Sequence, residues 1–127
     1  MLDDKTKTLA SGANFAVLTT LMEDGTPQSQ VMWVDHDDEH ILINTEIHRQ
    51  KFRNVSRDPR ATVTIIDSSN GYSYAEVRGT VVDTIHGERA RRHIDELSHR
   101  YFGKPYSNEI QSERVILKIR PDRQIVH

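Results

Sequence analysis

Short β-rich segments separated by turn signals are the feature that most constrains the fold of this chain. Residues 14–21 are rich in apolar and β-branched side chains, and the turn sequence Glu-Asp-Gly-Thr follows at residues 23–26. A second β-rich segment runs over residues 27–36, and a third covers residues 40–45 after an acidic turn at residues 37–39. Segments joined by connections this short pair as hairpins. We therefore expect a meander of three antiparallel strands.

Three further segments extend the expected sheet. Residues 61–66 form a fourth strand that ends at the Asp-Ser-Ser-Asn-Gly turn of residues 67–71. Residues 72–85 form a long fifth strand with a bend at Gly79, because glycine inside a strand often marks a bend or a bulge. Residues 114–120 have an alternating pattern and form a sixth strand.

Helical patterns are few. A short N-terminal helix ends over residues 6–10, and residues 49–58 form a short amphipathic helix that Pro59 closes. Residues 87–102 form the best helix, and its apolar stripe consists of Ala90, Ile94, Leu97 and Tyr101. So few helices cannot cover both faces of an open sheet. The fold class that we expect is therefore mainly β, with the sheet closed into a small antiparallel barrel.

Size and composition indicate one domain, residues 1–127, that shares its core with a second copy. Hydrophobic residues make up 35% of the 127 residues, which is low for a closed core. A domain of this size buries only about two-thirds of the surface that its unfolded chain exposes. A homodimer would supply the missing apolar contacts, and we expect one.

Charge and composition exclude several classes of function. The net charge of −2 gives no basic field for a nucleic-acid partner. The chain contains no cysteine, which excludes disulfides and thiol catalysis and fits a reducing compartment. Its first residues carry no apolar run, and no segment approaches the roughly 20 apolar residues of a membrane span. We therefore expect a cytoplasmic protein with no membrane partner.

Catalytic and metal-binding motifs in a fitting context are missing. Seven histidines are present, and the one pair with H-x-x-E-H spacing, His36 and His40, flanks the acidic turn of residues 37–39 and does not lie on a helix, so we expect no metal site. The sequence contains neither a G-x-S-x-G nucleophile motif nor the glycine-rich signatures of dinucleotide and P-loop sites.

Two polar stretches are candidates for ligand binding. Residues 48–53 are basic and lie where a strand gives way to a helix, which is a natural site for a phosphate group. The alternative is a solvated polar helix. Gln28-Ser29-Gln30 stands just before Met32 and Trp33, the only tryptophan. This stretch is either the wall of a flat ligand with polar edges, or part of the core or of an interface.

The ordered set of motifs resembles a known family. NFAVLTTLMEDGTPQSQVMWVDHDDEHILINT, RQKFRNVSRDPRATVTI and YAEVRGTVVD are similar to the pyridoxamine 5′-phosphate oxidase-like family of flavin and deazaflavin proteins, and most of all to its F420-dependent oxidoreductases. The resemblance covers residues 13–120. It implies a split β-barrel, an FMN-binding-like fold, and a homodimer with two cofactor sites at the subunit interface.

The resemblance also implies which residues bind the cofactor. Beside the flavin or deazaflavin ring it places Gln28, Gln30, Val31, Met32 and Trp33. Around the ribityl chain and the phosphate it places Asn44, Thr45, His48, Arg49 and Lys51. Amide side chains suit the pyrimidine edge of such a ring, which offers alternating donors and acceptors.

Departures from the family pattern favour F420 as the cofactor. The basic residues that pyridoxamine phosphate oxidases carry on the second strand are replaced here by neutral ones such as Gln28. By resemblance the protein is an F420-dependent oxidoreductase that transfers hydride to or from a small organic substrate. The alternatives are an FMN-dependent oxidoreductase and a non-catalytic binder of flavin, F420 or tetrapyrrole. No residue stands out as a catalytic acid, although Tyr72 and Tyr74 of a partner subunit are conceivable proton donors.

Overall fold

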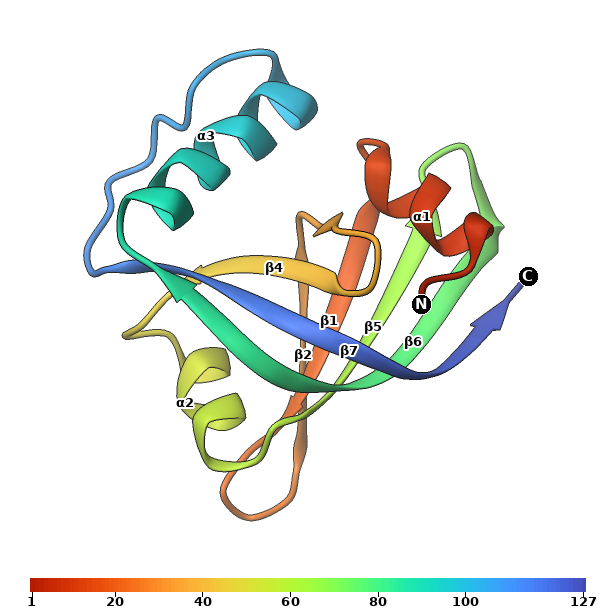
Figure 1. Cartoon of the computed structure of the whole chain (residues 1–127), viewed down its shortest axis with the longest axis horizontal. Helices are drawn as coiled ribbons and strands as arrows, with labels where there is room; N and C mark the ends of the chain where they lie inside the picture. Colours follow the sequence, from red (N-terminus) through yellow and green to blue (C-terminus); the bar gives the residue numbers. More distant parts are fainter.

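The computed structural model describes residues 1–127 as seven strands and three helices (Figure 1). In chain order the elements are α1 (Asp4–Ser11), β1 (Phe15–Leu21), β2 (Pro27–Met32), β3 (Asp35–His36), β4 (Ile41–Glu46), α2 (Gln50–Arg57), β5 (Arg60–Asp67), β6 (Asn70–His86), α3 (Glu88–Phe102) and β7 (Arg114–Val126). The expected mainly β class is confirmed.

All seven strands belong to one antiparallel sheet with the order β2-β1-β5-β6-β7-β4-β3. The strands β2 and β3 follow each other in the chain but lie at opposite ends of this order, so the sheet curls until its ends approach each other. The long strands β6 and β7 curve across the whole molecule and join the two halves (Figure 1). This is the arrangement of a split barrel.

The expected three-stranded meander is wrong, because the segment of residues 27–36 is two strands. β2 pairs with β1, whereas β3 pairs with β4. Between them the backbone bonds to side chains of α3 instead of a neighbouring strand. The Val34 amide donates to Tyr101 Oη at 3.2 Å, and the Val34 carbonyl accepts from Arg100 Nη1 at 2.8 Å. The chain therefore passes from one half of the barrel to the other at Trp33 and Val34.

The other expected elements are present, with two extensions. β7 continues to Val126, beyond the predicted end at residue 120, and its last residue still pairs with β6. The α3 stripe also includes His93 and Ser98, which are buried alongside Leu97. The expected bend in β6 falls at Gly79, where the register with β7 shifts. A Cβ at Gly79 would run into the carbonyl group of Arg120, so the close approach of the two strands requires glycine.

The barrel interior is filled by aliphatic side chains that alternate along the strands. The burial pattern of β1 is strictly alternating, and that of β5 is alternating over most of its length. β4 differs, because all six of its residues are buried. Its inner face packs into the barrel, and Asn44 and Glu46 are covered by α3, β7 and the loop before β7. This position of β4 builds the cavity described next.

Candidate functional site

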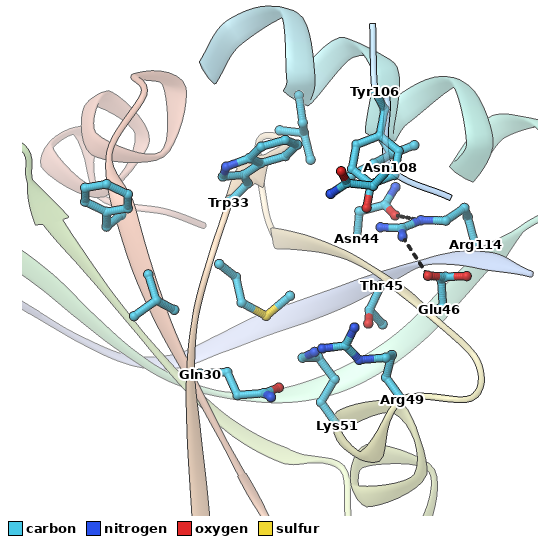
Figure 2. Close-up of a pocket in the computed structure, with 15 residues that line it drawn as sticks. Gln30, Trp33, Asn44, Thr45, Glu46, Arg49, Lys51, Tyr106, Asn108 and Arg114 are labelled. Carbon is cyan, nitrogen blue, oxygen red and sulfur yellow. Dashed lines mark hydrogen bonds and ion pairs between the residues drawn. The ribbon is translucent and has the colours of Figure 1, made fainter. Parts of the chain in front are cut away.

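A cavity of about 420 Å³ opens between β2, the β4–α2 junction and α3 (Figure 2). Its walls come from six different elements and from the loop before β7, so residues far apart in the sequence meet there. It is lined by Phe15, Gln30, Val31, Met32, Trp33, Asn44, Thr45, Glu46, Arg49, Lys51, Ile94, Leu97, Tyr106, Asn108 and Arg114.

Two cations enter the cavity where β4 gives way to α2. Arg49 immediately precedes α2, and Lys51 lies in the first turn of the helix, with no side chain capping its N-terminus. Lys51 is only 4% exposed, and its ammonium group has neither a hydrogen-bond acceptor nor a carboxylate partner in the protein. Burial, together with the nearby charges of Arg49 and Arg114, lowers the pKa of Lys51 to about 8. This end of the cavity is therefore a basic site without a counter-ion.

A third cation, Arg114, comes from β7 and is held on three sides. Its Nε donates to Asn44 Oδ1 at 2.9 Å, its Nη1 lies 3.4 Å from Glu46 Oε2, and its guanidinium group lies over the ring of Tyr106. Glu46 is directed by two backbone amides, because its Oε1 accepts from Gln111 and Ser112 at 2.7 Å each. The one carboxylate of the lining is thus committed to Arg114 and to the loop.

A buried chain of hydrogen bonds fixes Asn44 behind the cavity. The Asn44 amide group donates to the carbonyl of Ala90 at 2.9 Å and lies 3.0 Å from His93 Nδ1. The other ring nitrogen of His93 lies 2.9 Å from Asp35 Oδ2, and Asp35 also pairs with Arg100. Because the Asn44 amide is a donor, the His93 Nδ1 is an acceptor and its Nε2 carries the proton. The result is that Asn44 Oδ1 points at Arg114.

The opposite wall of the cavity is apolar and aromatic. The Trp33 indole stacks on Tyr101 with ring centroids 5.1 Å apart and meets Phe102 and Tyr106 edge to face. Met32 and Gln30 of β2 also line the cavity, and Oε1 of Gln30 is buried without a hydrogen-bond partner. The cavity thus offers a flat ring with polar edges both an aromatic wall for its face and a polar group for its edge.

Eight of the ten residues predicted to bind the cofactor line this cavity, and two do not. Gln28 is not among the lining residues and accepts from Asn54 Nδ2 at 3.4 Å. His48 is exposed and bonds to Ser112 Oγ. The eight that line the cavity are Gln30, Val31, Met32, Trp33, Asn44, Thr45, Arg49 and Lys51.

Sequence reasoning missed seven lining residues. Glu46 and Arg114 are direct partners in the β4–β7 register, a pairing that the local sequence does not reveal. Tyr106 and Asn108 lie in an irregular loop, whereas Ile94 and Leu97 belong to the apolar stripe of α3, which carried no sign of a ligand site. Phe15 completes the seven. Of the two tyrosines considered as donors, Tyr72 is 91% exposed and Tyr74 stacks on His127, so neither contributes to the cavity of its own chain.

Clusters of metal-ligating side chains and helices able to span a membrane are both absent. No three His, Asp or Glu side chains come together in a way that would hold a metal ion. None of the three helices has the length and apolar character needed to cross a bilayer.

Known proteins share this architecture along the whole chain. The family model described as pyridoxamine 5′-phosphate oxidase matches residues 2–126. A protein named F420 reductase is 30% identical to this chain over 98% of both chains, with a TM-score of 0.84. General stress protein 26 from Bacillus anthracis is 22% identical, with coverage of 97% and 91% and a TM-score of 0.72. The heme storage protein HutZ from Vibrio cholerae is 13% identical, with coverage of 98% and 94% and a TM-score of 0.67. The last two similarities concern the fold alone.

Proposed function

Because the chain belongs to the pyridoxamine 5′-phosphate oxidase family, we propose that it is an oxidoreductase that uses the deazaflavin coenzyme F420 and acts on a small organic substrate. The observation that carries the proposal is the unpaired ammonium group of Lys51, a residue only 4% exposed, beside Arg49. A buried charge without a partner is costly, and a ligand phosphate would relieve that cost. The 30% identity to a protein named F420 reductase supports F420 as the ligand.

The lining fits a planar ring on a ribityl chain that ends in phosphate. Arg49 and Lys51 would hold the phosphate, together with the uncapped first turn of α2. Asn44 and Thr45 lie between this basic end and the aromatic wall, where the chain would run. Gln30 would meet the polar edge of the ring, because its side-chain oxygen lacks a partner in the free protein.

When bound, the deazaflavin ring would supply hydride transfer. The residues of the protein would bind and orient the cofactor and keep water away from its ring. Met32 and Trp33 would fix the plane of the ring. Arg49 and Lys51 would hold the phosphate and so fix how far the ring reaches along the cavity. We assign no side chain of this cavity to proton transfer, because the only carboxylate in its lining, Glu46, is fully occupied by hydrogen bonds and an ion pair.

FMN is the alternative cofactor, because it has the same ring-chain-phosphate layout. A non-catalytic carrier of flavin or F420 is the alternative function. The cavity lining contains no histidine, the common axial ligand of haem iron. An enzyme would turn over with a reductant and an acceptor, whereas a carrier would bind tightly without turnover.

The experiment is a titration of the protein with F420 and with FMN, followed by tryptophan fluorescence. Trp33 is the only tryptophan and lines the cavity, so a planar chromophore in contact with it should quench its emission stoichiometrically. Free N-acetyltryptophanamide at the same absorbance corrects for inner-filter loss. We expect saturable quenching with tighter binding of F420. Unchanged emission with both cofactors would contradict the proposed site. Tighter binding of FMN than of F420 would contradict F420 as the cofactor and favour FMN.

We also propose that the active form is a homodimer. Phe15 and Val31 lie at the mouth of the cavity and are 57% and 67% exposed, so this rim is apolar and open. A second copy that covers the rim would bury both side chains and close the cavity on that side. Sedimentation at micromolar concentration should give a dimer, and a Val31→Asp variant should shift it towards monomer. A wild-type monomer under these conditions would contradict the proposal.

A further inference from the structure

Lys51 brings the only primary amine into the cavity, and nothing in the protein neutralises its charge. The side chain is buried, and its amino group points into the open space between α2 and β2 (Figure 2). The nearest charged groups of the lining are Arg49, at the start of α2, and Arg114, on β7. Glu46, at the end of β4, is the one carboxylate of the lining, and Arg114 and the amides of the loop before β7 occupy it.

This environment favours the neutral amine. Desolvation penalises the ammonium form, and the two neighbouring guanidinium groups repel it, which is why the pKa of Lys51 falls to about 8. Lysines that are desolvated or placed next to another cation are the ones that attack carbonyl groups in enzymes. The geometry here combines both conditions with a cavity large enough for a small molecule.

We propose that Lys51 is a nucleophilic lysine that forms imines with small aldehydes or keto acids carrying a carboxylate or phosphate group. The anionic class follows from the charges of the lining. With Lys51 neutral, Arg49 and Arg114 still face the cavity against the single carboxylate of Glu46. An anionic group on the ligand would therefore be attracted to the same end of the cavity as the amine, and its carbonyl carbon would be held beside Nζ.

The reaction is a condensation and needs no oxidant or reductant. The lone pair of Lys51 Nζ adds to the carbonyl carbon, and the C=O π bond becomes a hydroxyl group after proton transfer from nitrogen. The hydroxyl group then leaves as water with the second proton of the amine, and a C=N bond remains. Hydrolysis reverses the process and releases the carbonyl compound unchanged.

The inference is independent of which cofactor binds. A ligand phosphate at Arg49 and Lys51 would pair with the ammonium group and favour the protonated form, so cofactor binding and imine formation exclude each other. The imine would form in the cofactor-free protein. Failure of F420 to bind would leave the reactivity of Lys51 untouched, and an unreactive Lys51 would leave the F420 titration untouched.

The test is reductive trapping with glyoxylate and cyanoborohydride at pH 7, read out by peptide mass spectrometry. The chain has five lysines, so the other four serve as internal standards, and Lys104 is the exposed comparator. At pH 7 an amine with a pKa of about 8 is roughly 300 times more often neutral than one at the ordinary value of 10.5. A lower pKa also weakens the nucleophile, as it does for thiols, which reduces the advantage in rate to about 20-fold.

We expect Lys51 to be labelled about 20 times faster than Lys104, with a pH midpoint near 8. Inorganic phosphate should protect Lys51 and leave Lys104 unaffected. Labelling of Lys51 no faster than Lys104 would overturn the proposal. Acetaldehyde lacks the carboxylate and should show a smaller preference for Lys51, so an equal preference would overturn the anionic ligand class. A Lys51→Arg variant keeps the charge and should lose only the fast labelling phase.

Discussion

Replacing Lys51 by methionine should stabilise the ligand-free protein and weaken its response to phosphate ligands. Methionine fills nearly the same volume but carries no charge, and the lysine ammonium group has no partner to lose. The substitution therefore removes a desolvation cost without leaving an unsatisfied group behind. The usual outcome for a buried side chain with unpaired charge is a gain in stability.

The magnitude follows from the pKa of Lys51. A fall from 10.5 to about 8 means that the unfolded chain binds the proton more tightly than the folded protein between these values. The resulting penalty is fully present below pH 8 and amounts to about 3 kcal/mol at pH 7. As the pH rises towards 10.5 the penalty disappears, and at pH 10 about 1 kcal/mol remains.

Urea denaturation of wild type and Lys51→Met at equal protein concentration measures this difference. The variant should be more stable by up to about 3 kcal/mol at pH 7, and the gap should narrow to about 1 kcal/mol at pH 10. Phosphate or F420 should stabilise the wild type by mass action and should stabilise the variant less at the same ligand concentration, because only Arg49 and Arg114 remain. Lys104→Met, at an exposed position, is the matched control and should behave as wild type. A variant less stable than wild type at pH 7, or a gap that does not change with pH, would refute the reasoning.

Three other substitutions test the neighbouring contacts. Arg49→Ala should weaken cofactor binding by a factor of about 10 to 100, the usual loss of a charge-assisted phosphate contact, whereas Arg91→Ala on the outer face of α3 should bind as wild type in the same fluorescence titration. His93→Phe removes one of the two partners of the Asn44 amide and one of the partners of the Asp35 carboxylate, so urea denaturation should show a loss of about 2–4 kcal/mol. A neutral result would mean that the buried chain of hydrogen bonds contributes little to stability. Asp35→Asn should make the free energy of unfolding depend less on pH in acid. Burial raises the pKa of Asp35, but hydrogen bonds from His93 and Arg100 hold it well below its usual range. In urea denaturation the wild type should therefore lose stability as the pH falls below about 4, and the variant should lose less.

The strands could be predicted because their signals are local. Alternating burial in β1 and β5 follows from alternating side chains, and the turns at residues 23–26 and 67–71 use residues that favour turns. The break at Trp33 and Val34 has no such signal. It depends on Arg100 and Tyr101, more than 60 residues away, which bond to the backbone of Val34 in place of a neighbouring strand. A long-range side-chain contact of this kind cannot be found by local periodicity.

The position of the candidate site was predictable from the sequence, but the burial of Lys51 without a counter-ion was not. The junction of strand and basic helix indicated a phosphate site, and Arg49 and Lys51 do lie in the cavity. The same basic run gave no sign that Lys51 is buried while Arg49, two residues earlier, is exposed. His93 carried an unused signal, because it lies three residues after Ala90 and one before Ile94, on the buried face of α3.

The unpaired charge of Lys51 is a consequence of how the site is built. Glu46 lies in the same cavity wall and is the one lining carboxylate available for a salt bridge. Two backbone amides of the loop before β7 and the guanidinium group of Arg114 orient it away from that role. Arg114 is in turn held by Asn44, and Asn44 by His93. If the chain of contacts behind the cavity were loosened, Glu46 would be free to neutralise Lys51, and the cavity would lose both its affinity for anions and its reactive amine. The fold therefore keeps a destabilising charge available for a ligand by giving every competing carboxylate another partner.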